Sequence, residues 1–74
     1  MLSFNKERAL RKLRKLRRKQ KLTLRDLERL SGVDYSSISK IETGAAEPKV
    51  NTIVKLAKAL NVSLDELLEM EQVR

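Results

Sequence analysis

The stretch that decides the fold runs from Thr23 to Gly44 and reads TLRDLERLSGVDYSSISKIETG. Thr23 and Asp26 have the spacing of a capping box at the start of a helix. Gly32 predicts the end of that helix, because glycine adopts the left-handed conformation without steric cost. Asp34 is a second good N-cap, so the stretch predicts two short helices joined by a tight turn.

The two predicted helices run over about Leu24–Ser31 and Tyr35–Glu42, and apolar side chains fall where the helices would cross. Those side chains are Leu27, Val33, Ile38 and Ile41. Two short helices that cross steeply through a glycine-containing turn form a helix-turn-helix. The second helix of such a unit usually lies in the major groove of DNA.

The composition excludes several classes of protein. The chain has 74 residues, with no cysteine and no histidine. This length predicts one domain, over 1–74, that buries only about 60% of the surface of its unfolded form. Disulfide frameworks, zinc fingers and catalysis by Cys or His are excluded. We expect no cofactor, no metal and no enzymatic activity. No apolar stretch approaches the ~20 residues of a membrane span, so we expect a soluble intracellular protein.

Charge is distributed unevenly along the chain. Residues 1–25 hold eleven Lys or Arg and one acid, whereas residues 26–74 hold six basic and nine acidic residues. A cationic block on a mildly acidic body suits a polyanion such as nucleic acid, whose phosphates release counterions on binding. The alternative is a solvated helix face, which is what most runs of charge are.

The rest of the chain predicts further helices. Periodic apolar residues predict one over about Asn5–Gln20 and one over about Val50–Leu60. Asn61 suits a left-handed cap, and a capping box at Ser63–Glu66 opens a last helix. No strand pattern is present, and the tail Met70–Arg74 is expected to fray. The further side chains expected to face inward are Ala9, Leu10, Leu13, Leu16, Ile53, Leu56, Ala57, Leu60, Leu64, Leu67 and Leu68.

A series of motifs carries a resemblance to a known family. They are Leu13-Arg-Lys-Leu16-Arg17, Leu22-Thr23, Leu27, Gly32-Val33, Ile38-Ser-Lys-Ile-Glu-Thr-Gly44, Glu47-Pro48 and Leu56-Ala-Lys-Ala-Leu-Asn-Val-Ser-Leu-Asp-Glu-Leu67. In this order and spacing the chain resembles the Cro/phage-repressor helix-turn-helix family, also called the xenobiotic-response-element type, over about residues 9–68. The resemblance implies an all-α, five-helix, lambda-repressor-like DNA-binding domain. It also implies a cytoplasmic protein of a prokaryote or phage.

Two residues depart from the family pattern. Leu24 stands where the family usually has a polar residue that meets a phosphate, so the contact there reduces to backbone N–H groups. Glu28 stands where the family usually has Ala at a close helix crossing. We expect its carboxylate to swing outward while its stem packs, and we expect Glu28→Ala to raise thermal stability.

The resemblance and the helix periodicity together predict the residues that contact DNA. The expected base-reading residues are Tyr35, Ser36, Ser39 and Lys40. Lysine donates to guanine O6 and N7, and serine pairs with either purine. Tyr35 would meet a thymine methyl or give its hydroxyl to a phosphate. The alternative is that all four are merely exposed polar residues.

Further residues are expected to contact phosphates. They are Thr23, Leu24, Thr43, Gly44, Lys49, Arg14 and Arg18. For Lys49 an ordinary surface position is an equal alternative. By resemblance, Arg17 and Glu42 form a partly buried ion pair, and we assign this pair to structure rather than to DNA contact.

The leading hypothesis is a sequence-specific regulator of transcription that binds double-stranded DNA in the major groove. We expect a repressor that acts as a homodimer on an inverted repeat, with Leu68, Met70 and Val73 as candidate dimer contacts. An alternative is an antitoxin-like or other protein-interaction module with weak, unspecific DNA binding. A third reading is a binder of nucleic acid or anionic membrane that uses the first helix alone. Against it, the leucines of that helix are needed in the core.

Overall fold

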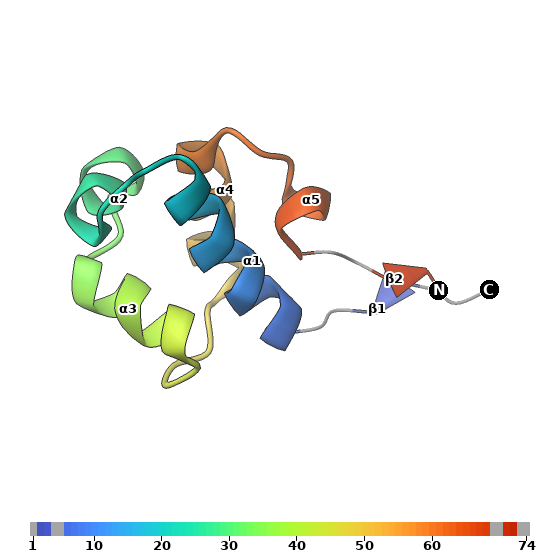
Figure 1. The fold of residues 1–74 in the computed structure, drawn as a ribbon. Coiled ribbons are helices and arrows are strands. Elements are labelled where there is room, and N and C mark those ends of the chain that lie inside the picture. The colour runs from blue at the N-terminus through green and yellow to red at the C-terminus, as the bar shows by residue number, and fades with distance from the viewer. Residues whose placement is uncertain (1, 4–5, 69–70, 73–74) are drawn as a thin grey trace.

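The computed structural model describes residues 2–3, 6–68 and 71–72. The helices are α1 (Lys6–Lys19), α2 (Leu24–Ser31), α3 (Tyr35–Thr43), α4 (Val50–Leu60) and α5 (Leu64–Leu68), and the strands are β1 (Leu2–Ser3) and β2 (Glu71–Gln72). Figure 1 shows α1 in the middle of the molecule, with α2 and α3 on one side and α5 and the strands on the other. Of the helices in the described residues, none is long and apolar enough to cross a bilayer.

Most helix bounds follow the sequence-based expectation. Helices α2 and α4 have the predicted bounds, α3 extends one residue further, to Thr43, and α1 ends at Lys19, one residue earlier than expected. The predicted start of the first helix, Asn5, lies outside the described residues.

A short antiparallel ribbon corrects the expectation of a chain without strands and with a fraying tail. Leu2 is paired with Gln72, and Ser3 with Glu71. Two-residue strands leave no alternating pattern in the sequence, and their pairing joins opposite ends of the chain, so local signals did not predict them. The rest of the tail expected to fray, Met70, Val73 and Arg74, lies outside the described residues.

Local hydrogen bonds start and end α2. Thr23 Oγ1 accepts from the N–H of Asp26 at 3.0 Å, and Asp26 Oδ2 accepts from the N–H of Thr23 at 2.9 Å, which completes the predicted capping box. Gly32 has the predicted left-handed conformation, with φ of 78°. The N–H of Val33 then donates to Ser31 Oγ at 3.0 Å. The capping box starts α2, while Gly32 and the bond of Val33 to Ser31 end it and turn the chain into α3.

The core is one cluster of aliphatic side chains. Helix α1 contacts α3, α4 and α5, while α2 contacts α3 and α4. The buried side chains are Leu13, Leu27, Ile38, Ile41, Ile53, Leu56, Ala57, Leu60 and Leu67, all of them predicted. Leu16 and Val33 are half-buried against this cluster.

One expected core residue is exposed. Leu64 was expected to face inward, but it is 37% exposed. It is the first residue of the short helix α5, so it lies at the rim, one turn before Leu67 reaches the core. The side chains of Ala9, Leu10 and Leu68, also expected inside, are not among those the structure describes.

Two non-glycine residues reverse the chain at helix ends. Asn61, the predicted left-handed cap of α4, has φ of 57°, and Lys21 after α1 has φ of 58°. Beyond α1, the N–H of Lys21 donates to the carbonyl of Arg18 at 2.9 Å, and that of Leu22 to the carbonyl of Arg17 at 3.1 Å. This is the Schellman pattern, in which glycine is the preferred left-handed residue. Because the residue at this position is lysine and not glycine, the sequence did not predict this reversal of the chain.

Arg17 and Glu42 form the expected ion pair between α1 and α3. Arg17 Nε donates to Glu42 Oε2 at 2.7 Å and Nη2 donates to Oε1 at 2.9 Å, which is a bidentate arrangement. The Arg17 side chain is 11% exposed and that of Glu42 is 5% exposed. Nη1 of Arg17 donates to the carbonyl of Leu22 at 2.8 Å. The hydrogen bonds to Glu42 raise the pKa of Arg17, and burial opposes them.

We expect Arg17→Met to lower the free energy of unfolding by about 3–5 kcal/mol, because it leaves the carboxylate of Glu42 buried without its partner. Urea denaturation measures this change. The matched control is Arg18→Met, a change at an exposed position of the same helix, which should alter stability by no more than about 0.5 kcal/mol. Equal effects of the two substitutions would show that the pair does not hold α1 to α3.

Candidate nucleic-acid interface

The start of α2 offers backbone groups and one hydroxyl. Thr23 Oγ1 accepts from the N–H of Asp26, and its hydroxyl also has a proton to donate, which a phosphate oxygen requires. Leu24 is half-buried and packs against the core. Its side chain therefore contributes nothing polar, and the first N–H groups of α2 are what an anion would meet.

The start of α3 is occupied by two carboxylates of the protein itself. Asp34 Oδ2 accepts from the N–H of Ser36 at 3.1 Å, as expected of an N-cap. Glu28, from α2, reaches across the turn, and its Oε2 accepts from the N–H of Tyr35 at 3.1 Å. A helix N-terminus attracts anions through its free N–H groups. Here those of Tyr35 and Ser36 are taken.

Glu28 therefore differs from the sequence-based expectation. Its carboxylate does not swing outward into solvent, and its side chain is 29% exposed. The reason is the unsatisfied N–H at the first residue of α3, which a carboxylate from the preceding helix can reach. The expectation that Glu28→Ala would raise stability consequently loses its basis.

Two carboxylates at the helix starts, Asp26 of the capping box and the N-cap Asp34, have lowered pKa values. The backbone hydrogen bond from Thr23, followed by its side-chain bond, lowers the pKa of Asp26. The hydroxyl of Ser36 is the largest cause that lowers the pKa of Asp34. Both groups are therefore firmly ionised at neutral pH and favour the positive ends of their helices.

The predicted base-reading residues differ in what they can offer. The hydroxyl of Ser36 donates to Asp34 Oδ2, which leaves its oxygen as an acceptor for an amino group of adenine or cytosine. Ser39 is half-buried, and Lys40 is exposed. Tyr35 is 37% exposed, and the guanidinium carbon of Arg25 lies over its ring at 3.9 Å from the ring centroid.

A hollow of about 340 Å³ adjoins α3 and the loop before α4. It brings together two predicted residues, Lys40 and Lys49, which come from the two sides of the loop. Ser37, which is exposed and lines the same hollow, was missed by sequence reasoning. Its position three residues before Lys40 on a helix was the signal that could have found it. The other lining residues are Val33, Ile41, Ala46, Glu47, Pro48 and Thr52.

Thr43 and Gly44 serve the end of α3 rather than offering donors. Thr43 Oγ1 donates to the carbonyl of Lys40 at 3.2 Å, so its hydroxyl proton is not presented to a phosphate in this conformation. Gly44 is left-handed, with φ of 83°, and its N–H donates to the carbonyls of Ile41 and Lys40. No atom lies within 4 Å of a Cβ built at Gly44, so its surroundings are open to a close approach.

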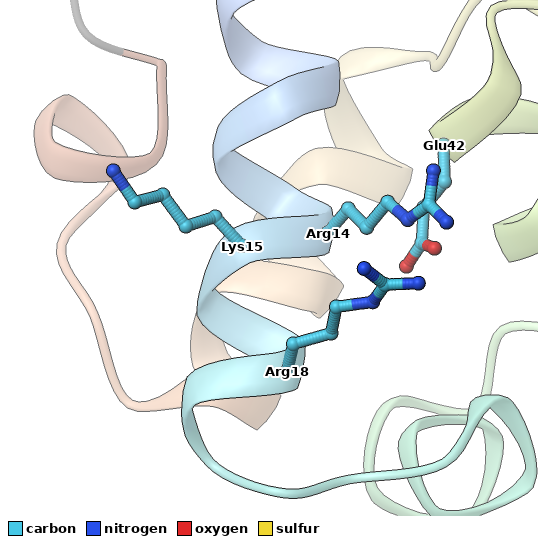
Figure 2. A pocket seen from close by; sticks show the side chains of 4 residues that line it. All are labelled: Arg14, Lys15, Arg18 and Glu42. Atoms are coloured by element: carbon cyan, nitrogen blue, oxygen red, sulfur yellow. The ribbon is translucent and has the colours of Figure 1, made fainter.

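Arginines of α1 gather beside Glu42, in the last turn of α3. A hollow of about 390 Å³ is lined by Arg14, Lys15, Arg18 and Glu42. Figure 2 shows the side chains of Arg14 and Arg18 extending from α1 toward Glu42, whereas Lys15 points the opposite way. Arg17 already engages both oxygens of Glu42. The local charge of these three arginines and one glutamate is net positive, which suits an anion.

Comparison with known proteins adds to this geometry. A helix-turn-helix family model matches residues 13–67. The HTH-type transcriptional repressor RghR of Bacillus subtilis (strain 168) is 46% identical over 57 residues, which make up 76% of this chain and 42% of that protein. This chain spans 32–42% of the length of the first curated relatives that it matches.

Solved structures are also similar. The restriction-modification controller protein C.AhdI from Aeromonas hydrophila has a TM-score of 0.79 and 34% identity, over 84% of this chain and 94% of that one. The P22 c2 repressor, in a crystal structure with a synthetic operator, has a TM-score of 0.74 and 33% identity, over 82% of this chain and 92% of that one. The fold is thus the helical fold of repressor-type DNA-binding domains.

We expect Glu28→Ala to lower thermal stability. The loss of a capping bond costs about 1 kcal/mol, and a few tenths are gained in helix propensity. Because about 1 kcal/mol shifts the melting temperature of a domain of this size by about 4–8 °C, the midpoint should fall by a few degrees. Calorimetry measures the midpoint. Glu28→Gln, which keeps an acceptor oxygen, should retain most of the stability. A midpoint that rises in Glu28→Ala would contradict the cap seen in the structure.

The lowered pKa of Asp26 predicts an acid-dependent contribution to stability. The contribution is fully present above the unfolded-state pKa of about 3.9 and is lost as pH falls through the lower folded-state pKa. Urea denaturation of the parent and of Asp26→Asn at several pH values tests this. The parent should be the more stable at pH 7, and its advantage should shrink toward pH 2. A difference that stays constant with pH would refute the assignment.

Proposed function

Because the chain belongs to the Cro/phage-repressor-type helix-turn-helix family, we propose that it is a sequence-specific DNA-binding transcriptional repressor. In this proposal α3 of the five-helix domain enters the major groove of double-stranded DNA in the cytoplasm. Two copies bind an inverted repeat, with their recognition helices about one helical turn apart. The residues expected as dimer contacts, Leu68, Met70 and Val73, lie outside the part whose side chains are described.

The observation that carries the proposal is the distribution of cations around α3. Lys40 and Lys49 line one hollow that adjoins this helix, and Arg14 and Arg18 line another. The same helix exposes small polar side chains, those of Ser36 and Ser37, and Ser37 lines the first of these hollows. Cations beside a helix with exposed polar side chains suit a duplex, whose phosphates border a groove that displays base edges.

The residues then divide into two roles. Lys40 donates to guanine, and Ser36 accepts from an amino group, as base-reading residues. Ser39 joins them from a half-buried position. Phosphates are held by Arg14, Arg18 and Lys49 through charge, and by the hydroxyl of Thr23 with the backbone N–H of Leu24, while Gly44 leaves room for the DNA backbone to approach closely. This division predicts sequence preference from α3 and salt-dependent affinity from the cations.

Selection from a random DNA duplex library tests the proposal. The purified chain is used at ~150 mM salt, where nonspecific binding is weakened but not abolished. An enriched inverted repeat supports a dimer that reads DNA directly. A pool that binds but never converges contradicts the proposal and favours the alternative of a protein-interaction module with weak, unspecific DNA binding.

We expect Lys40→Ala to relax the preference at one position of each half-site, by about 1–3 kcal/mol of discrimination. Equilibrium binding to the selected site and to its single-base variants measures this. The control is Lys58→Ala, which removes an exposed charge from the last turn of α4 and should leave the preference unchanged. An equal loss of affinity on every sequence would instead make Lys40 a phosphate contact.

A further inference from the structure

An arginine that the sequence did not single out lies at the junction of α2 and α3. The guanidinium carbon of Arg25, in the first turn of α2, lies 3.9 Å from the ring centroid of Tyr35, the first residue of α3. The side chain of Arg25 is 67% exposed, and Tyr35 is 37% exposed. The stack is therefore a surface feature that joins the N-terminal ends of the two helices.

Glu28 fixes both members of the stack. Its Oε1 lies 3.8 Å from Nη1 of Arg25, and its Oε2 accepts from the N–H of Tyr35 at 3.1 Å. One carboxylate thus holds the backbone of the aromatic residue and faces the cation above the ring. This arrangement orders a long, exposed side chain before any ligand arrives.

Stacking leaves the hydrogen-bonding edges of a guanidinium available. An arginine that stacks its planar face on an aromatic ring keeps its in-plane N–H donors for other partners. Such a fork matches O6 and N7 of guanine, which is the commonest specific contact of arginine in the major groove. Tyr35 stands at the N-terminal end of α3, the part of a recognition helix that meets base edges.

The surrounding charges favour a base over a phosphate at this place. Glu28 and Asp34 both direct carboxylates to the start of α3. A phosphate beside them would be repelled by two negative charges, whereas the neutral edge of a base would not. The cations of α1 and of the α3–α4 loop have fewer carboxylates about them and remain the better phosphate contacts.

We propose that Arg25 is a specificity-determining residue that reads a guanine, and that Tyr35 is the platform that positions it. This inference rests on the proposed function, and it assigns Tyr35 a different role from the thymine or phosphate contact expected from the sequence. Tyr35 acts through the arginine, and its phenol hydroxyl is not required.

Binding of the selected operator and of all its single-base variants tests the inference. Arg25→Ala should abolish the preference for one guanine in each half-site, a loss of roughly 5- to 150-fold in discrimination, and should leave the other positions unchanged. Arg25→Lys should recover little of this discrimination, because it restores the charge without the fork. Arg29→Ala removes another exposed arginine from α2 and should leave every preference intact.

The ring is tested separately from its hydroxyl. Tyr35→Phe should keep the guanine preference, since the platform remains, whereas Tyr35→Leu should weaken it at that same position. Circular dichroism of each variant verifies that it is folded. Loss of the preference in Tyr35→Phe would overturn the role of platform.

Other outcomes overturn the reading of a base by Arg25. An equal loss on all sequences, with a salt slope reduced by about 0.9 per protomer, would make it a phosphate contact. If Arg25→Ala keeps the selectivity of the parent chain, the contact between Arg25 and Tyr35 is a structural feature that reads no base. A parent chain that selects no sequence would overturn the proposed function as well, which distinguishes that failure from a failure of this inference alone.

Discussion

The bidentate pair between Arg17 and Glu42 is the interaction on which the arrangement of this molecule depends. It joins the last turn of the cationic helix α1 to the end of α3, and a third donor of Arg17 holds the carbonyl of Leu22 as the chain leaves α1. Because the planar fork of arginine fixes direction as well as distance, the pair sets how α1 lies against α3. The positions of Arg14 and Arg18, on the same stretch of α1, follow from it.

The two helix starts at the interface are chemically different, although both carry a capping residue. At α2 the cap leaves a hydroxyl proton on Thr23 and first-turn N–H groups, which suits an anion. At α3, Glu28 and Asp34 occupy the first N–H groups. A helix end filled with protein carboxylates favours neutral base edges and cations over phosphate. In the proposed complex, different parts of the surface would thus hold the DNA backbone and read the sequence.

Local sequence signals predicted the helices and the buried side chains well, because helix caps and apolar spacing act within a few residues. Thr23, Gly32, Asp34 and Asn61 all have the conformations expected of them. The sequence did not predict contacts between helices. Glu28 reaching across the turn to Tyr35, and Arg25 stacking on Tyr35, each need two helices already in place. Another such contact joins Gln20 Nε2 to the carbonyl of Leu60, at 2.7 Å, and ties the end of α1 to the end of α4.

The pairing of β1 with β2 has a consequence for how the molecule is connected to anything else. Both strands lie at the opposite pole from α2 and α3 (Figure 1). A polypeptide joined to either strand would therefore leave from that pole, behind the surface proposed to face DNA. A fluorescent protein, an affinity tag or an entire effector domain fused there would lie on the side of the complex that faces away from DNA. Such a fusion would leave α2 and α3 uncovered, but at β2 it would adjoin in sequence Met70 and Val73, two of the residues expected to contact a second copy.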